Sequence, residues 1–127
     1  MSGTKVGQVS IRDIAAGRLP EILRLQLGQK LIEAAKDGNV EMVRKLLNMQ
    51  GVDVNAANSG GDTALILAAA HGNVEVVKEL LGNEKVDVNV ANTNGSTALI
   101  WAARNGKVEV VKLIMDKLGL EGIKITS

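Results

Sequence analysis

A repeat of 34 residues constrains this sequence more than any other feature. Residues 62–81, DTALILAAAHGNVEVVKELL, return at 96–115 as STALIWAARNGKVEVVKLIM, with 12 of 20 positions identical. A looser copy lies at 28–47, and the equivalent glycines Gly38, Gly72 and Gly106 are spaced by 34 residues. Repetition at this period is typical of solenoids, in which each unit packs only on its neighbours. The sequence therefore predicts a stack of similar units.

Each copy is predicted to form two short helices joined by a turn. In the first copy, apolar residues recur at helical spacing before and after Gly38, which suits the left-handed backbone of a tight reversal. The predicted helices run from about 29 to 38 and 39 to 48, then 63–70 and 73–81, then 97–104 and 107–117. One copy is too small to bury its apolar face alone, so the core must form between copies.

Polar residues mark the predicted helix starts. Thr63 and Thr97 precede the alanine-rich helices, where a hydroxyl can accept a backbone N–H. Asn39 and Asn73 are expected to cap the second helices of their copies in the same way, whereas Lys107 cannot.

The segments between the helix pairs, 51–61 and 85–95, are predicted to be extended loops. Each contains the letters VDVN followed by asparagine and glycine, which is turn chemistry. Gly61 and Gly95 are available for a positive φ.

These letters identify a resemblance. VDVN, an Asn/Gly turn and T-A-L-I-x-A-A-x-x-G-x-V-E-V-V are similar to the ankyrin repeat over roughly residues 29–120. The resemblance implies an all-α solenoid of stacked helix–turn–helix units with β-hairpin-like finger loops. The family's usual Thr-Pro-Leu-His is here Thr-Ala-Leu-Ile, at 63–66 and 97–100. Loss of the histidine removes hydrogen bonds that tie neighbouring loops, so we expect apolar packing to compensate and the loops to be less rigid.

The chain is accordingly divided into four parts. Residues 1–9 are expected to be a flexible lead and 10–28 a helical N-terminal cap; the repeats then occupy 29–61, 62–95 and 96–118. For 22–27 we favour a helix, although the alternation of Leu23, Leu25 and Leu27 also fits a strand. The tail 119–127 also fits a strand through Ile123 and Ile125.

Composition argues against chemistry of the chain's own. The net charge of +1 gives no footprint for nucleic acid or an anionic membrane, and no apolar run is long enough to span a bilayer. With no cysteine and the single histidine His71, neither a nucleophile with its base nor a metal site is expected. Glu41, Glu75 and Glu109 recur in register, and their place at helix starts explains them. We therefore expect no enzyme activity and no cofactor, and a cytoplasmic location.

The resemblance implies that partners bind to the finger tips and to the exposed side of the first helices. The tips comprise Ser59, Gly60, Asp62, Thr93, Asn94 and Ser96. The helix positions are Leu67, Ala70, His71, Trp101, Arg104 and Asn105, with Lys36 and Asp37 in the first copy. Trp101 is either a packing residue between repeats or a hydrophobic anchor for a partner.

A non-enzymatic protein-interaction module is the function that these features favour. Two alternatives stay open at this point. One is an engineered repeat scaffold without a natural partner. The other is a self-assembling subunit that pairs through its terminal segments, 1–9 and 119–127.

Overall fold

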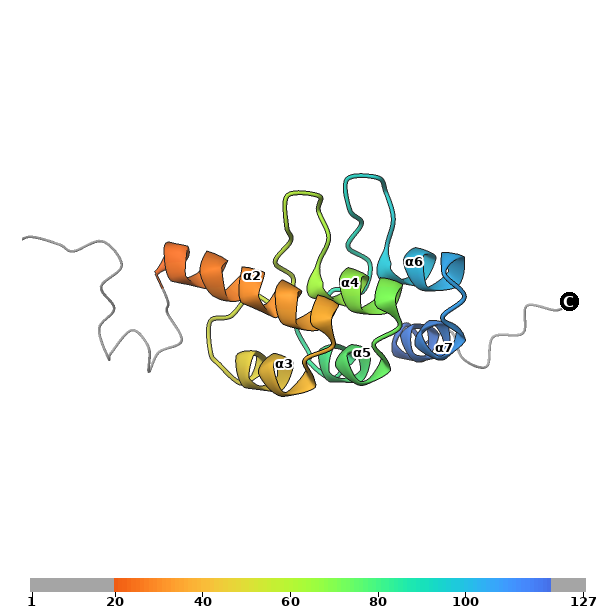
Figure 1. Ribbon diagram of the computed structural model, residues 1–127, viewed down its shortest axis with the longest axis horizontal. Helices are drawn as coiled ribbons and strands as arrows, with labels where there is room; N and C mark the ends of the chain where they lie inside the picture. Colours follow the sequence, from red (N-terminus) through yellow and green to blue (C-terminus); the bar gives the residue numbers. More distant parts are fainter. Residues whose placement is uncertain (1–19, 120–127) are drawn as a thin grey trace, which may run out of the picture.

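The structure is a computed structural model that describes residues 20–119. Within this range six helices follow one another as three antiparallel pairs (Figure 1). They are α2 (Glu21–Asp37), α3 (Val40–Leu47), α4 (Ala64–His71), α5 (Val74–Leu81), α6 (Ala98–Arg104) and α7 (Val108–Lys117). The predicted all-α solenoid is confirmed, and its five shorter helices end within about two residues of their predicted bounds.

The helices lie in two layers. α2, α4 and α6 pack side by side in one layer, and α3, α5 and α7 form the other (Figure 1). Each pair contacts the next pair along the chain. The core between them contains no aromatic ring other than Trp101 at its margin; it consists of leucine, isoleucine, valine and fully buried alanines such as Ala35, Ala68 and Ala102. Small side chains let the helix pairs approach closely, as a thin layered core requires.

The first helix is longer than the repeat pattern predicts. α2 runs unbroken for 17 residues from Glu21 and passes through Gly28, so the expected division between cap and first repeat lies inside it. The strand alternative for 22–27 is wrong, because these residues are helical. Gly28 is buried, and a Cβ at this position would stand 2.7 Å from the Cβ of Ala56. Glycine is tolerated in this helix because it lets the following loop approach the backbone.

The predicted caps hold at three positions and fail at a fourth. Thr63 Oγ1 and Thr97 Oγ1 accept from the N–H of Ile66 and Ile100, and Asn39 caps α3. Asn73, however, does not cap α5. Its Nδ2 instead donates to the carbonyl oxygens of Ala35 (2.8 Å) and Lys36 (3.2 Å). The side chain thus reaches back to the open end of α2, where the last carbonyls of a helix lack partners.

Two fingers, residues 48–63 and 82–97, rise from the helix layers (Figure 1). Asparagine side chains tie them together. Asn55 Nδ2 donates to the carbonyl of Lys85 and Asn55 Oδ1 accepts from Asp87 N–H, while Asn92 Nδ2 donates to Asp62 Oδ1 (2.9 Å). The N–H of Thr93 bonds to the carbonyl of Gly60. The expectation that apolar packing must replace lost hydrogen bonds is therefore wrong, because other polar groups supply them.

The fingers contain little β-structure. A single antiparallel bridge joins Ala57 to Thr63 within the described range. Gly61 and Gly95 have φ of 81° and 78°, as predicted for the turns. The predicted lead, most of the cap at 10–19 and the strand predicted in the tail lie outside the described residues, and so does their pairing.

Candidate functional site: the inner-helix face

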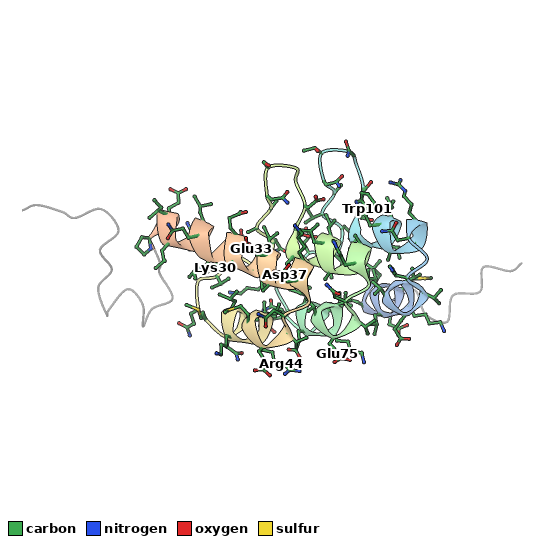
Figure 2. All side chains as sticks on the ribbon, viewed as in Figure 1. Lys30, Glu33, Asp37, Arg44, Glu75 and Trp101 are labelled. Carbon is green, nitrogen blue, oxygen red and sulfur yellow. The ribbon has the colours of Figure 1, made fainter. Side chains whose placement is uncertain are left out.

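Three positions per repeat form one continuous face on α2, α4 and α6, which we call the inner-helix face (Figure 2). Its members repeat every 34 residues: Glu33, Lys36 and Asp37, then Leu67, Ala70 and His71, then Trp101, Arg104 and Asn105. The three helices pack side by side in this order, so the sequence register becomes rows across the molecule. Charged groups occupy the α2 end, and the tryptophan lies on α6.

Trp101 and Arg104 form the one large anchor pair of this face. The guanidinium carbon of Arg104 lies 5.2 Å from the centroid of the indole ring, within cation–π distance. Trp101 is half-buried and packs against the core, while Arg104 is exposed. The indole Nε1 is covered, yet it has no acceptor among the described residues. Both interpretations of Trp101 thus hold in part: the ring packs, and its edge remains available.

The centre of the face is smaller and more polar. His71 is exposed, and its Nδ1 lies 2.9 Å from the carbonyl oxygen of Leu67. Asn105 Nδ2 donates to the carbonyl of Ala70 at 3.0 Å, which links α6 to α4. Leu67 and Ala70 are half-buried. These residues are rigidly placed by the helices, and their polar groups are already partly engaged.

The finger-tip residues divide into two groups. Ser59, Thr93 and Asn94 are exposed at the tips, together with Gly60. Ser96, by contrast, is buried and its N–H donates to Asn92 Oδ1. Asp62 is half-buried and accepts the bond from Asn92 that joins the two fingers. Ser96 and Asp62 therefore shape the fingers and present little to solvent.

A hollow beside the face includes residues that the sequence reasoning missed. It has a volume of about 270 Å³ and lies between α2, α4 and the first finger. Lys30, Glu33 and Lys36 line one side, and Leu67 and Asn58 the other. Glu33 occupies the register position of Leu67 and Trp101, so the repeat spacing alone was enough to find it. Lys30 shows no such signal, because its equivalents Ala64 and Ala98 are buried.

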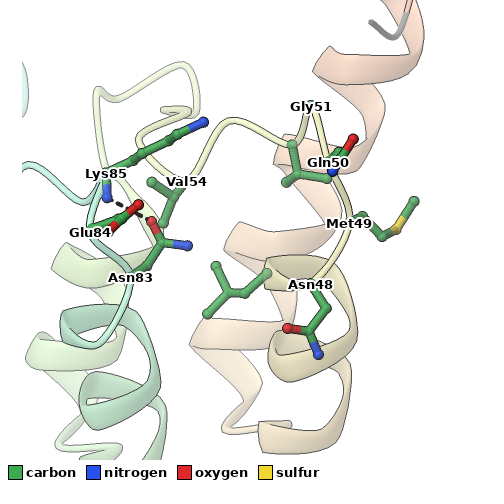
Figure 3. Close-up of a pocket in the computed structure, with 10 residues that line it drawn as sticks. Asn48, Met49, Gln50, Gly51, Val54, Asn83, Glu84 and Lys85 are labelled. Carbon is green, nitrogen blue, oxygen red and sulfur yellow. Dashed lines mark hydrogen bonds between the residues drawn. The ribbon is translucent and has the colours of Figure 1, made fainter. Parts of the chain in front are cut away.

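The largest hollow lies elsewhere, between the bases of the two fingers (Figure 3). It measures about 520 Å³, and backbone and polar groups of 48–51 and 83–85 line most of it. Lys85 N–H donates to Asn83 Oδ1 within it (Figure 3). Its lining combines neither a nucleophile with a base nor a metal-ligand set. We assign it no chemistry.

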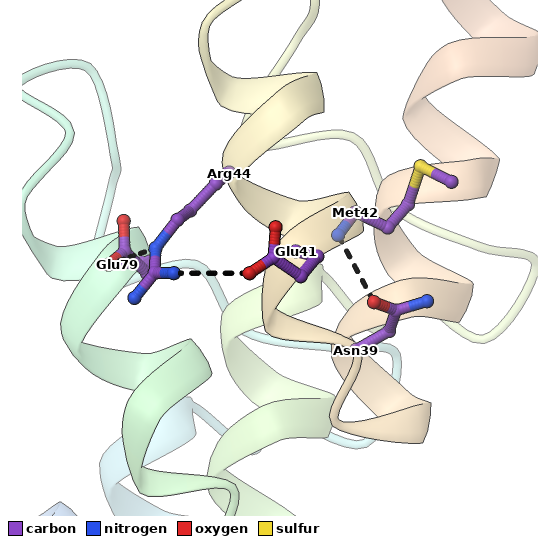
Figure 4. Close-up of polar contacts among 5 residues, drawn as sticks. All are labelled: Asn39, Glu41, Met42, Arg44 and Glu79. Carbon is purple, nitrogen blue, oxygen red and sulfur yellow. Dashed lines mark hydrogen bonds and ion pairs between the residues drawn. The ribbon is translucent and has the colours of Figure 1, made fainter.

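Electrostatic perturbation is confined to one surface ion pair among the described residues (Figure 4). Arg44 Nε donates to Glu79 Oε2 at 3.0 Å, and Glu41 lies 3.7 Å away. The hydrogen bond to Glu79 and its negative charge raise the pKa of Arg44. Within residues 20–119 no cluster of three His, Asp or Glu side chains is placed to hold a metal ion. No helix in that range is long and apolar enough to cross a membrane.

Comparison with known proteins agrees with this geometry. The family described as ankyrin repeats (three copies) matches residues 31–127. An ankyrin repeat protein of Rickettsia felis is 41% identical over 49 residues, which cover 39% of this chain and 76% of that protein. The stacked helix pairs, the fingers and the 34-residue register are those that the sequence resemblance implies. The chain belongs to the ankyrin-repeat family.

Proposed function

We propose that this chain binds a protein partner through the inner-helix face and the exposed finger tips, and that it catalyses no reaction. Ankyrin repeats generally act as protein–protein interaction modules and are typically non-enzymatic. The observation that carries the proposal is the pair of Trp101 and Arg104, stacked 5.2 Å apart at one end of the face. Tryptophan and arginine are the residues most enriched among binding hot spots.

Each part of the face has a distinct role in this proposal. Trp101 supplies a fixed apolar surface and an N–H that a partner's carbonyl can accept. Arg104 holds the ring and offers donors to a carboxylate. At the other end, Glu33 and Lys36 are exposed charges that set orientation and partner choice rather than affinity.

Capture of partners by a tagged full chain tests the proposal. We expect proteins retained by the wild-type chain to be lost from Trp101→Ala/Arg104→Ala, because truncating a hot-spot pair costs about 2 kcal/mol or more. The matched control is Met42→Ala/Lys45→Ala, which truncates one apolar and one basic exposed residue on α3, in the other layer.

Two outcomes would contradict the proposal. Equal loss in the two double variants would show that capture does not depend on the inner-helix face. Capture of no protein by the wild-type chain from any extract would instead favour a scaffold without a partner. Circular dichroism melts of both variants must match the wild type, so that a loss reflects binding and not unfolding.

A further inference from the structure

The back of the third repeat exposes positions that are buried in the repeat before it. Ile66 is 1% exposed, but its equivalent Ile100 is 41% exposed; Val108 is 62% exposed. Ala69 and Val77 are fully buried, whereas Ala103 is exposed and Val111 is half-buried. In the second repeat, α6 and α7 cover these positions. We call the exposed set Ile100, Ala103, Gly106, Val108, Val111 and Lys112 the end face.

The glycine turns show the same difference. A Cβ on Gly72 would meet Cδ of Lys107 at 2.9 Å, because the lysine stem of the next repeat lies over that turn. A Cβ on Gly106 would meet nothing within 4 Å. The end face is therefore shaped like an interface between repeats and lacks the unit that covers it. Part of it forms a hollow of about 270 Å³ with an almost wholly apolar floor.

Charge defines what fits the end face. Its hollow is flanked by Lys107 and Lys112 and by no acidic residue. Lys112 stands in the register position of Arg44, and in the first repeat Arg44 bonds to Glu79 of the helix that covers it (Figure 4). The interface that is already formed thus pairs an apolar stripe with one carboxylate opposite the basic residue.

From this equivalence we propose that the end face docks an amphipathic helical segment of a protein partner, with a carboxylate beside its apolar stripe that reaches Lys112. A second copy of this chain is a poorer occupant. In the first repeat, the position equivalent to Glu79 is Lys45. A copy stacked in the same register would bring Lys45 to Lys112, and like charges at an interface oppose association.

A titration followed by amide NMR of the full chain tests the proposal. The probe is a synthetic peptide of residues 63–83 of this chain, held helical by a side-chain staple, because it contains the helix pair and Glu79 that cover the first repeat. We expect saturable shifts at Gly106, Val108, Val111 and Lys112. Lys112→Glu should weaken binding about tenfold, since a favourable charge pair becomes a repulsive one.

The controls use the register. Lys78→Glu makes the same substitution one repeat earlier, where α6 and α7 already cover the repeat, and should leave affinity unchanged. A Glu79→Lys peptide should bind the Lys112→Glu chain better than the wild-type chain. Shifts spread over other surfaces, equal effects of Lys112→Glu and Lys78→Glu, or no saturation in the millimolar range would each overturn the proposal.

Two further measurements address the other occupants. Sedimentation velocity of the chain alone should show a monomer; a dimer that Val108→Glu disrupts would replace the proposed partner by a second copy. Amide shifts of the end face should be the same in the full chain and in residues 1–119. A difference at Gly106 and Val108 would assign the face to residues 120–127 and overturn the proposal.

Discussion

Asn39 and Asn73 occupy the same position in successive repeats but bond differently. Asn39 Oδ1 accepts from the N–H of Met42 within its own helix. Asn73 uses its Nδ2 to bond to Ala35 and Lys36 in the repeat before. Asn39 acts as an acceptor and Asn73 as a donor, because only Asn73 has a preceding repeat whose helix ends beside it.

Substitution by aspartate separates the two roles. Asp accepts a hydrogen bond at a helix start as well as Asn does, so Asn39→Asp should change the free energy of unfolding by no more than about 0.5 kcal/mol. Asn73→Asp removes both donors and places a carboxylate against two carbonyl oxygens, and should destabilise the chain by about 1–3 kcal/mol. Urea denaturation measures both values. Equal effects at the two positions would contradict the bond assignments.

Neighbouring alanines of a single helix also differ sharply in their surroundings. Ala102 of α6 is fully buried in the core, whereas Ala103 is exposed. The layer of the solenoid at Ala102, like that at Ala68 in the previous repeat, has room for a methyl group and little more. At the scale of the helix, the thickness of the stack therefore depends on which alanine faces the next pair.

Enlarging each alanine tests this packing. Ala102→Leu should overpack the layer and lower the free energy of unfolding by about 1–3 kcal/mol. Ala103→Leu adds the same three carbons to an exposed helical site and should stay within about 0.5 kcal/mol of the wild type. Thermal melting of the two variants gives the comparison, and an unchanged melting temperature for Ala102→Leu would refute the observed packing of α6.

Across the whole molecule, stability should decline toward the third repeat. The second repeat is covered on both sides by neighbours, but α6 and α7 are covered on one side only among the described residues. In a solenoid, stability is approximately a sum of repeat terms and interface terms between nearest neighbours. The third repeat lacks one interface term, as the exposure of Val108 and Ile100 shows.

Hydrogen exchange can detect this gradient. We expect the amides of α6 and α7 to exchange faster than those of α4 and α5, because an end repeat opens at a lower free energy than a central one. Mass spectrometry of labelled peptides from the intact chain measures the difference. Uniform protection across residues 64–117 would mean that the repeats open as one unit. The helical peptide of residues 63–83, if it docks on the end face, should slow exchange in α6 and α7 selectively.

Sequence and tertiary structure determined different parts of this protein. The sequence by itself determined the repeat period, the helix pairs and the left-handed glycine turns, because these depend on local periodicity and on residues with special backbone freedom. It also placed Leu67, Trp101 and their neighbours in register. The tertiary structure decided what each polar group bonds to. The bonds of Asn73 to α2, Asn55 to the second finger and Asn92 to Asp62 span 30 or more residues. No local pattern encodes those partners, since they meet only when neighbouring repeats stack, and the uncovered end face became visible for the same reason.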